Sequence, residues 1–190
     1  GDCLFADAFW GDTARVQSLQ ALGWEADNSL PYVLNRTEIK SLAVPALPDG
    51  FSYRAAKSTA DAAALAEVHN ASFGSSWTPE VYRRVMTSPG YEPERELVIQ
   101  AADKSFVAFT IIWFDHLNAT GLFEPVGTHK DYRRRGFGRA IILYGMQQRA
   151  GAGMKFATVA PFGRNEAARG LYHACGFKPW HLQDAYKKYF

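Results

Sequence analysis

The sequence is poor in cysteine, with only Cys3 and Cys175 among its 190 residues. They lie far apart and form no CxxC pair, which argues against a disulfide framework and against zinc sites built on paired cysteines. We therefore expect no metal and a reducing, cytoplasmic compartment. No apolar run approaches the roughly 20 residues of a membrane-spanning helix, so we expect no membrane partner. No signal peptide is visible at the start, although the printed residues begin without Met.

The chain also lacks a large excess of either positive or negative charge. Twenty-one Lys and Arg residues against 19 Asp and Glu residues leave a formal net charge of +2. Proteins that bind nucleic acid generally carry a broad basic surface, so we expect no nucleic-acid partner. The chain does have 47% hydrophobic residues, which is enough for the core of a domain of ordinary size.

The order of the expected elements indicates an α/β fold with a mixed, mostly antiparallel central sheet and helices on both faces. Apolar periodicity and capping residues predict helices over 58–73, 78–86, 138–150 and 164–177. Runs of β-branched and aromatic residues predict strands over 51–56, 121–129 and 154–162, a hairpin over 95–116, and one or two strands in the tail after 177. Pro125 has no amide donor, so we expect a bulge or a locally unpaired site within 121–129.

Two segments of the chain resemble each other. Residues 14–35 and 167–190 each predict a helix closed by Gly and an aromatic residue, Gly23-Trp24 and Gly176-Phe177, and then a strand. We interpret residues 1–40 as the C-terminal end of a preceding, related domain, 41–50 as a linker rich in Pro and Gly, and 51–190 as the main domain. The alternative is that Leu-Gly-aromatic is merely a common end of a helix.

The stretch RRRGFG (133–138) sets a cluster of positive charge beside two glycines, between an expected strand and an expected helix. The free amides and the dipole of a helix N-terminus favour an anion, and glycine lets the backbone approach a bulky phosphate. The alternative is a sharp turn with solvated arginines. The stretch is neither a Walker loop nor GxGxxG, because Ile141 stands where the third glycine would be.

Two motifs then carry a resemblance to a known family. Arg133, Gly136 and Gly138 fit [QR]-x-x-G-x-[GA], and Asn165 to Phe177 fit N-x-x-A-x-x-L-Y-x-x-x-G-F. In this order and spacing they resemble the GNAT superfamily of acetyl-CoA-dependent N-acetyltransferases, over residues 50–190. The resemblance implies a central sheet that is splayed near Pro125-Val126.

The resemblance also implies the cofactor, acetyl-CoA, and its site. Backbone groups of 126–128 would pair with the pantetheine arm, the loop at 134–139 would hold the pyrophosphate, and Asn165 would contact the pantetheine. The implied cofactor-binding residues are Val126, Gly127, Thr128, Arg133, Arg134, Arg135, Gly136, Phe137, Gly138, Arg139 and Asn165. The three arginines cannot all touch phosphate, so we expect at least one to point into solvent.

Acetyl transfer to an amine needs a proton acceptor for the amine and gains from an acid for the leaving thiolate. Tyr172, at its motif position, is the implied acid, although it could be only a core aromatic. Glu124 is the candidate base or amine anchor, because alternation along a strand would place it on the face of Val126; the alternative is a solvated strand residue. His69 and His173 are interpreted as structural or solvent-facing, and His129 as a loop residue.

The resemblance implies that Phe73, Trp77 and Tyr82 lie at one wall of the acceptor site and that Trp180 and His181 lie at the opposite wall. For each aromatic residue the alternative, which we favour, is packing in the core. The acceptor would be a small-molecule amine acetylated by direct transfer, because Cys175 lacks the neighbours of a nucleophile. A non-catalytic acyl-CoA-binding lobe is the alternative. Neither the identity of the acceptor nor the oligomeric state follows from the sequence, and a homodimer stays open.

Overall fold

The computed structural model describes residues 2–40, 43–161 and 165–190, and their side chains except at 28–31. The chain divides into two compact units, one made of Gly1–Thr37 with Thr158–Phe190 and the other of Glu38–Ala157. These units differ from the expected division at 1–40, 41–50 and 51–190, because the end of the chain packs with its beginning. Within the expected linker, residues 43–50 form no helix or strand, and 41–42 lie outside the described residues.

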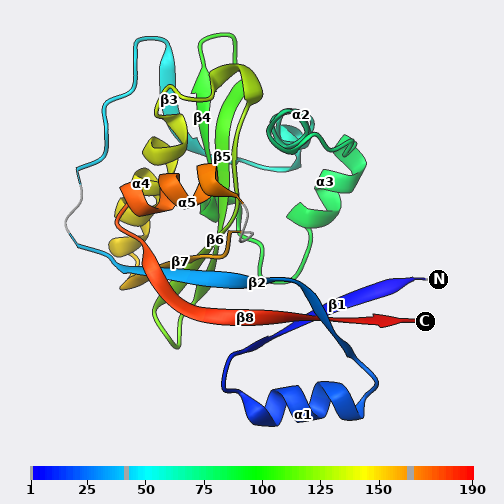
Figure 1. Cartoon of the computed structure of the whole chain (residues 1–190). Helices are drawn as coiled ribbons and strands as arrows, with labels where there is room; N and C mark the ends of the chain where they lie inside the picture. Colours follow the sequence, from blue (N-terminus) through cyan, green and yellow to red (C-terminus); the bar gives the residue numbers. More distant parts are fainter. Residues whose placement is uncertain (1, 41–42, 162–164) are drawn as a thin grey trace. The chain divides into compact units, whose positions relative to one another are not determined.

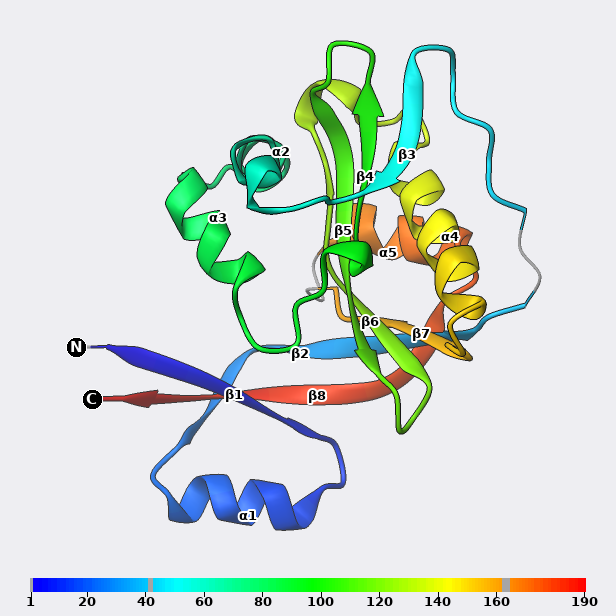
Figure 2. The same ribbon diagram turned by 180° about the vertical axis from the view of Figure 1, so that it is seen from behind.

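The second unit is an antiparallel sheet covered on both faces (Figures 1 and 2). Its strands pair in the order β6-β5-β4-β3. They are β3 (Phe51–Ala55), β4 (Glu96–Ala101), β5 (Phe106–Asp115) and β6 (Thr120–Thr128). The short helices η1 (Thr59–Asp61) and η2 (Pro93–Arg95) lie between β3 and β4, and η3 (Lys130–Tyr132) follows β6. Helices α2 (Ala62–Phe73) and α3 (Pro79–Met86) lie on one side, and α4 (Phe137–Ala150) lies on the other.

Local sequence signals account for these elements. Thr78 caps α3 by accepting a hydrogen bond from the Val81 amide, and Pro79 occupies the first helical position. The expected hairpin is confirmed, with Lys104 in its turn at φ 72°. Its strands are buried on both faces, since α2 and α4 each contact β5. The α/β class and the mostly antiparallel pairing are therefore confirmed.

The expected bulge in β6 is present and changes which face each side chain occupies. Phe123 pairs with Ile112 and Val126 pairs with Thr110, so β6 holds one residue more than β5 between these pairs. Ile112 and Thr110 share a face, and therefore Phe123 and Val126 do so too. Glu124 follows Phe123 directly and lies on the opposite face. The inference that Glu124 and Val126 share a face is wrong, because the extra residue interrupts the alternation.

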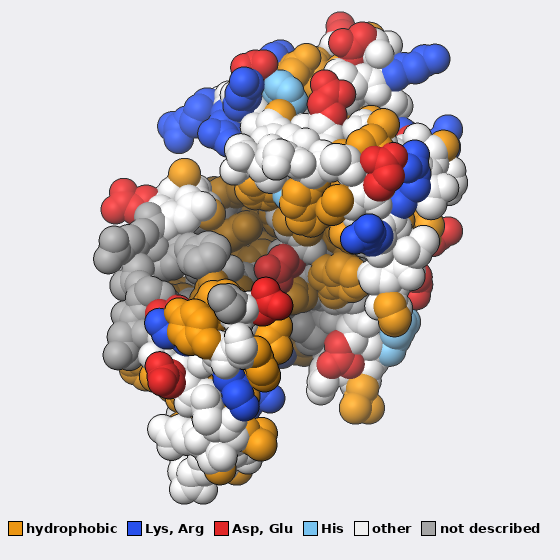
Figure 3. All heavy atoms as spheres, turned by 90° about the vertical axis from the view of Figure 1, so that its right-hand side faces the viewer, with side chains coloured by type: hydrophobic (Ala, Val, Ile, Leu, Met, Phe, Trp, Pro, Cys, Tyr) orange, Lys and Arg blue, Asp and Glu red, His pale blue; other side chains and the backbone are white. Residues whose placement is uncertain are grey.

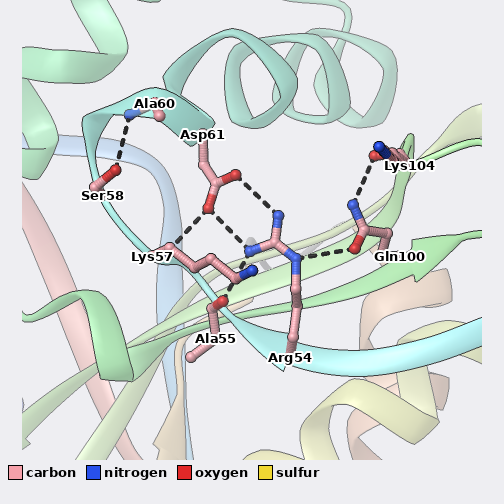
Figure 4. A network of polar contacts seen from close by, with 8 residues as sticks. All are labelled: Arg54, Ala55, Lys57, Ser58, Ala60, Asp61, Gln100 and Lys104. Atoms are coloured by element: carbon pink, nitrogen blue, oxygen red, sulfur yellow. Dashed lines mark hydrogen bonds and ion pairs between the residues drawn. The ribbon is translucent and has the colours of Figure 1, made fainter.

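Polar contacts tie β3 to η1 and β4 (Figure 4). The Arg54 guanidinium donates to both carboxylate oxygens of Asp61 at 2.9 Å and to Gln100 at 3.1 Å. The hydrogen bonds from Arg54 lower the pKa of Asp61. Asp61 also accepts from the Lys57 amide, so this carboxylate holds the start of the helical segment against the edge of the sheet.

A carboxylic acid is buried completely at the start of β4. Glu96 is 0% exposed, and its carboxylate accepts hydrogen bonds from the hydroxyls of Tyr82 and Tyr91. Burial raises the pKa of Glu96 to about 7, against the opposing effect of the two hydroxyls. Folding therefore favours the protonated form of the Glu96 carboxyl group.

The buried acid predicts a pH-dependent stability. Since the pKa of Glu96 rises from 4.5 to about 7 on folding, its contribution is fully present below about pH 4.5 and is lost as the pH rises through 7. Each unit of pKa is worth about 1.4 kcal/mol, so the loss amounts to about 3 kcal/mol. Denaturant unfolding from pH 4.5 to 8 should show this decline in the wild type and in the exposed control Glu67→Gln. Glu96→Gln should lack it, and a parallel decline in that variant would contradict the assignment.

In the first unit, β8 (Lys178–Tyr189) lies between β1 (Cys3–Phe9) and β2 (Glu25–Glu38), with antiparallel pairing on both sides. Helix α1 (Thr13–Ala21) joins β1 to β2, and α5 (Glu166–Ala174) precedes β8. Strand β7 (Phe156–Val159) runs across the boundary of the two units. Phe162 and Arg164, at the ends of an expected strand and an expected helix, lie outside the described residues. None of the described helices has the length and hydropathy needed to cross a membrane.

The two similar segments have the same local structure. Gly23 and Gly176 both adopt a positive φ, 77° and 89°, just beyond their helices. The next amide, of Trp24 or Phe177, donates to the carbonyl five residues back, at Leu19 or Tyr172. Both helices therefore end in the same Schellman motif, and the expected helix-glycine-strand repeat is confirmed as local structure.

Candidate functional site

The junction between β6 and α4 has the form of an anion site. After η3 the chain passes through Arg134 and Gly136, both at positive φ, 64° and 85°. Helix α4 begins at Phe137, and its N-cap residue, Gly136, has no side chain that could cap the helix. The first amides of this 14-residue helix are therefore not satisfied by an N-cap side chain, and the helix dipole favours an anion there. At φ 85°, Gly136 is needed for this turn.

The three arginines of the loop have different surroundings. The Arg133 guanidinium donates to the Ser72 carbonyl at 2.6 Å and so ties the loop to α2. The Arg135 guanidinium lies 5.3 to 5.6 Å from the centroids of three aromatic rings, which belong to Phe51, Tyr132 and Phe137. All three arginines are exposed. Arg133 thus has a structural role that its motif position did not indicate.

The strand expected to pair with the pantetheine arm is the end of β6. Val126 and Thr128 are half-buried, and Gly127 is buried. A Cβ at Gly127 would lie 2.3 Å from Cε1 of Phe109 and 2.9 Å from Ser72 Oγ. Packing under the Phe109 ring therefore explains this glycine without a ligand. Val126 faces the side of α4, since it shares a face with Phe123, whose ring lies against Gly145 of that helix.

Asn165 and Tyr172 belong to the first unit, whereas the other expected catalytic and cofactor-binding residues belong to the second. Asn165 is the N-cap of α5, and its Oδ1 accepts from the Ala168 amide at 3.0 Å. The cap does not use the side-chain nitrogen. Tyr172 is 9% exposed, and its ring meets that of Phe177 edge-on.

The repeat in the first unit offers an internal comparison for Tyr172. Asp12 caps α1 as Asn165 caps α5, and the two helices end in the same motif. At the position that corresponds to Tyr172, α1 carries Leu19, which is also buried. An apolar side chain is therefore sufficient for packing at the equivalent place of α1, whereas α5 carries a tyrosine there.

The first unit also contains a cavity of about 590 Å³ that the sequence did not indicate. It lies beside the exposed face of α5, where Glu166, Arg169 and His173 follow one another at helical spacing. Val33, Asn35 and Pro179 complete it from β2 and β8. The residues come from three separate stretches of the chain, so no local motif could have revealed it.

Aromatic side chains gather where α2 meets α3. The expected acceptor-wall residues Phe73, Trp77 and Tyr82 all contact the ring of His69. Phe73 is 51% exposed and Trp77 is 36% exposed, which is unusual for large aromatic residues. Hydrophobic side chains also reach the surface among charged ones in Figure 3. The structure thus brings these three residues together, around a histidine that was interpreted as structural or solvent-facing.

The other expected residues are placed as follows. Glu124 is exposed, and its backbone carbonyl accepts a hydrogen bond from the Trp113 indole at 2.7 Å. By its register it lies on the α2 side of the sheet, together with the aromatic group around His69. In the first unit, the rings of Trp180 and His181 lie 4.4 Å apart.

Comparisons with known proteins agree with the two motifs. Residues 93–179 match the family model of the acetyltransferase (GNAT) domain, a range that includes both motifs. A mycothiol acetyltransferase of Thermobispora bispora is 26% identical over an alignment of 162 residues, and the match covers 77% of this chain and 53% of that protein. The chain thus spans about half the length of this curated relative.

Solved structures share the fold. A GCN5-related N-acetyltransferase from Sphaerobacter thermophilus superposes with a TM-score of 0.72 at 18% identity, over 98% of this chain and 59% of that one. A tandem GNAT protein from the clavulanic acid biosynthesis pathway gives 0.73 at 16% identity, over 98% and 63%. At these identities the likeness concerns the fold alone.

Proposed function

We propose that this chain, whose residues 93–179 match the family model of the GNAT acetyltransferase domain, moves the acetyl group of acetyl-CoA to a primary amine of a small molecule. The observation that carries the proposal is the uncapped N-terminus of α4, which follows a turn through Gly136 beside exposed arginines. Such a junction suits the pyrophosphate of a nucleotide cofactor. The family match supplies acetyl transfer as the reaction type.

The cofactor would be held mainly by backbone. Amides of 134–139 would bind the pyrophosphate, with charge supplied by Arg134, Arg135 or Arg139, since Arg133 is engaged with Ser72. Backbone groups of Val126, Gly127 and Thr128 would pair with the pantetheine arm. The side-chain nitrogen of Asn165, which the cap of α5 does not use, would donate to the same arm.

The chemistry is a direct transfer. The amine nitrogen attacks the thioester carbonyl carbon, the C–S bond breaks, and the thiolate leaves as the amine loses its proton. Tyr172 would protonate the departing thiolate, and Glu124 would help to remove the proton of the amine, directly or through water. The position of Glu124 on the α2 side of the sheet supports a place beside the acceptor, on the face opposite to Val126.

The rival function is a lobe that binds acyl-CoA without chemistry. The tyrosine at the motif position of α5, where the equivalent position of α1 carries Leu19, supports the enzyme over this rival. The test is a calorimetric titration with acetyl-CoA, followed by measurement of CoA release with a panel of primary amines. Binding with amine-dependent release supports the enzyme, binding without release supports the rival, and no binding overturns both.

We also propose that residues 1–40 are the C-terminal end of a second GNAT-like lobe. The helix-glycine-strand repeat supports this, as do the matching caps Asp12 and Asn165. Leu19 and Trp24 of this segment pack around Tyr186 of β8 in a small core.

Removal of this segment should therefore be damaging. Deletion of residues 1–45 would strip β8 of both neighbouring strands and expose Tyr186, so we expect a lower melting temperature or aggregation. If the deletion variant cannot be purified, the milder variant Leu19→Ala provides the test. It should lower the free energy of unfolding by about 2–5 kcal/mol. Calorimetry and light scattering provide the measurements. An unaltered melting temperature and a monodisperse deletion variant would show that the segment does not support the fold.

A further inference from the structure

The side chain of His69, on α2, is held in place by aromatic rings and a hydrogen bond. It is 8% exposed, and its ring stacks on Trp77 with centroids 3.9 Å apart and an interplanar angle of 19°. The rings of Phe73, Tyr82 and Phe109 enclose it from other directions. Its Nδ1 lies 2.8 Å from Ser75 Oγ. This enclosure leaves the imidazole one orientation.

The hydrogen bonds around His69 also fix its tautomer. The Asn70 side chain donates to the Trp77 carbonyl and accepts from the Trp77 amide, both at 2.8 Å, so its amide orientation is set. The Ser75 hydroxyl donates its single proton to Asn70 Oδ1 at 2.8 Å. Ser75 Oγ can therefore only accept from His69, which places the proton on Nδ1 and a lone pair on Nε2.

That lone pair is unused within the described part of the chain, where Ser75 is the hydrogen-bond partner of His69. Nε2 is also not among the fully enclosed unpartnered atoms, so it keeps some contact with solvent. One turn along α2, Ser72 Oγ is buried and lacks a partner among the described residues. A Cβ at Gly127 would lie 2.9 Å from this hydroxyl, so Ser72 points at the strand proposed to hold the cofactor.

Buried polar atoms without partners are costly, about 1–3 kcal/mol each. Ser72 Oγ is such an atom among the described residues. Together with the solvent-accessible lone pair of His69 Nε2, one turn away on the same helix, it indicates a place where a polar ligand completes the site. Both lie on the side of the sheet to which the register assigns Glu124. The exposed rings of Phe73 and Trp77 adjoin His69, so the histidine can be reached from the surface at this wall.

We propose that His69 is a catalytic base of the proposed acetyl transfer and that Ser72 binds the polar acceptor beside it. The inference rests on the proposed function. As the C–N bond forms, the amine nitrogen becomes acidic and passes its proton to His69 Nε2. The C–S bond then breaks, and the thiolate leaves as CoA-SH with the proton of Tyr172, which solvent restores. The imidazolium returns its proton to solvent and keeps its Nδ1–H on Ser75.

The charges around His69 are compatible with this role. Tyr82 of α3, whose hydroxyl donates to buried Glu96, meets the ring of His69, and Arg133 lies at the Ser72 carbonyl. Glu124 lies on the same side of the sheet. The other charged or titratable groups nearby are Glu80, Arg83 and Arg84 of α3, and Glu67, His129, Lys130 and Asp131, which line a pocket together with Asn70 and Trp77. Burial lowers the pKa of His69 from its ordinary 6.5. The ring is thus neutral at pH 7, the state that a base requires.

The test compares two substitutions at one position. In His69→Asn the side-chain amide keeps a donor for Ser75 and removes Nε2, so kcat should fall on the order of 100- to 10,000-fold, with acetyl-CoA affinity unchanged. The acidic limb of the wild-type pH–rate profile, below pH 6.5, should vanish. His69→Gln, which offers an acceptor oxygen but no base, should recover acceptor KM more than kcat. The exposed control His116→Asn should match the wild type.

Nitrogen-15 NMR of the free protein provides a readout that needs no substrate. It should show a protonated Nδ1 and an unprotonated Nε2 on His69 at pH 7.5, and Ser75→Ala should weaken that preference. The opposite tautomer would overturn the proposal, as would a His69→Asn variant with wild-type kcat and acidic limb. The pH–rate profile of Glu124→Gln distinguishes Glu124 from His69 as the proton acceptor. If His69 is the base, that variant should keep the acidic limb of the wild type, and loss of the limb would contradict the proposal. A wild type that neither binds acetyl-CoA nor acetylates any amine would instead refute the proposed function, and His69 with it.

Discussion

Replacement of Tyr172 by Phe should lower kcat by about 100- to 10,000-fold, the usual range for loss of an acid or base. The ring would keep its contact with Phe177, and only the hydroxyl would be lost. The hydroxyl is proposed to act only on the departing thiolate, after acetyl-CoA has bound. The affinity of the protein for acetyl-CoA should therefore be unchanged. The decisive quantity is kcat across a pH–rate profile with an accepted amine, together with calorimetric binding of acetyl-CoA.

A matched control is available on α4. Tyr144 is stacked on Tyr53 at 4.3 Å and has no role in the proposed chemistry, so Tyr144→Phe should retain wild-type kcat. If Tyr172→Phe does the same throughout the profile, the thiolate leaves unaided or another group protonates it. Loss of folding is not expected, because Leu19 shows that an apolar side chain satisfies the equivalent position.

Gly138→Asp should weaken acetyl-CoA binding by roughly 100-fold or more. The carboxylate would enter the first turn of α4, where the pyrophosphate is proposed to lie, and two like charges about 4 Å apart repel by about 4 kcal/mol near a protein surface. Gly138 is not among the positive-φ glycines, and Asp is favourable in the first turn of a helix. The free protein should therefore fold normally.

Gly138→Asn separates charge from size, since it has the same shape without the charge. We expect an intermediate affinity for Asn and a larger loss for Asp, which should diminish as salt is added. Isothermal titration with CoA gives both values. A well-folded Gly138→Asp protein with unchanged CoA affinity would remove the pyrophosphate from this loop.

Local signals in the sequence were sufficient for most elements of the fold. Thr78 and Pro79 fixed the start of α3, and Gly176 fixed the end of α5, because caps act within a few residues. The bulge at Pro125 was also expected from its missing donor. The effect of the bulge on Glu124 was not expected, because the face on which Glu124 lies depends on how β6 pairs with β5.

The site was less accessible to sequence reasoning, since its key contacts are not local. Arg133 meets Ser72 across 61 residues, which no motif encodes. His69 was interpreted as structural or solvent-facing because a lone histidine on an amphipathic helix carries no signal of its tautomer. That signal arises from Ser75, Asn70 and the Trp77 backbone together. Likewise the division into two units depends on the pairing of β8 with both β1 and β2. The sequence of a strand does not indicate which other strands it pairs with.

The most direct test of the account is to follow the acetyl group itself. Acetyl-CoA labelled with carbon-13 in the acetyl group would be incubated with the protein and a panel comprising an alkylamine, a polyamine, an amino sugar and an amino-acid amide. Mass spectrometry would then quantify the labelled amide and free CoA. The account predicts that at least one amine yields labelled amide and CoA in equal amounts, and that Gly138→Asp abolishes both. CoA release without any labelled amide, or no binding of acetyl-CoA at all, would contradict it.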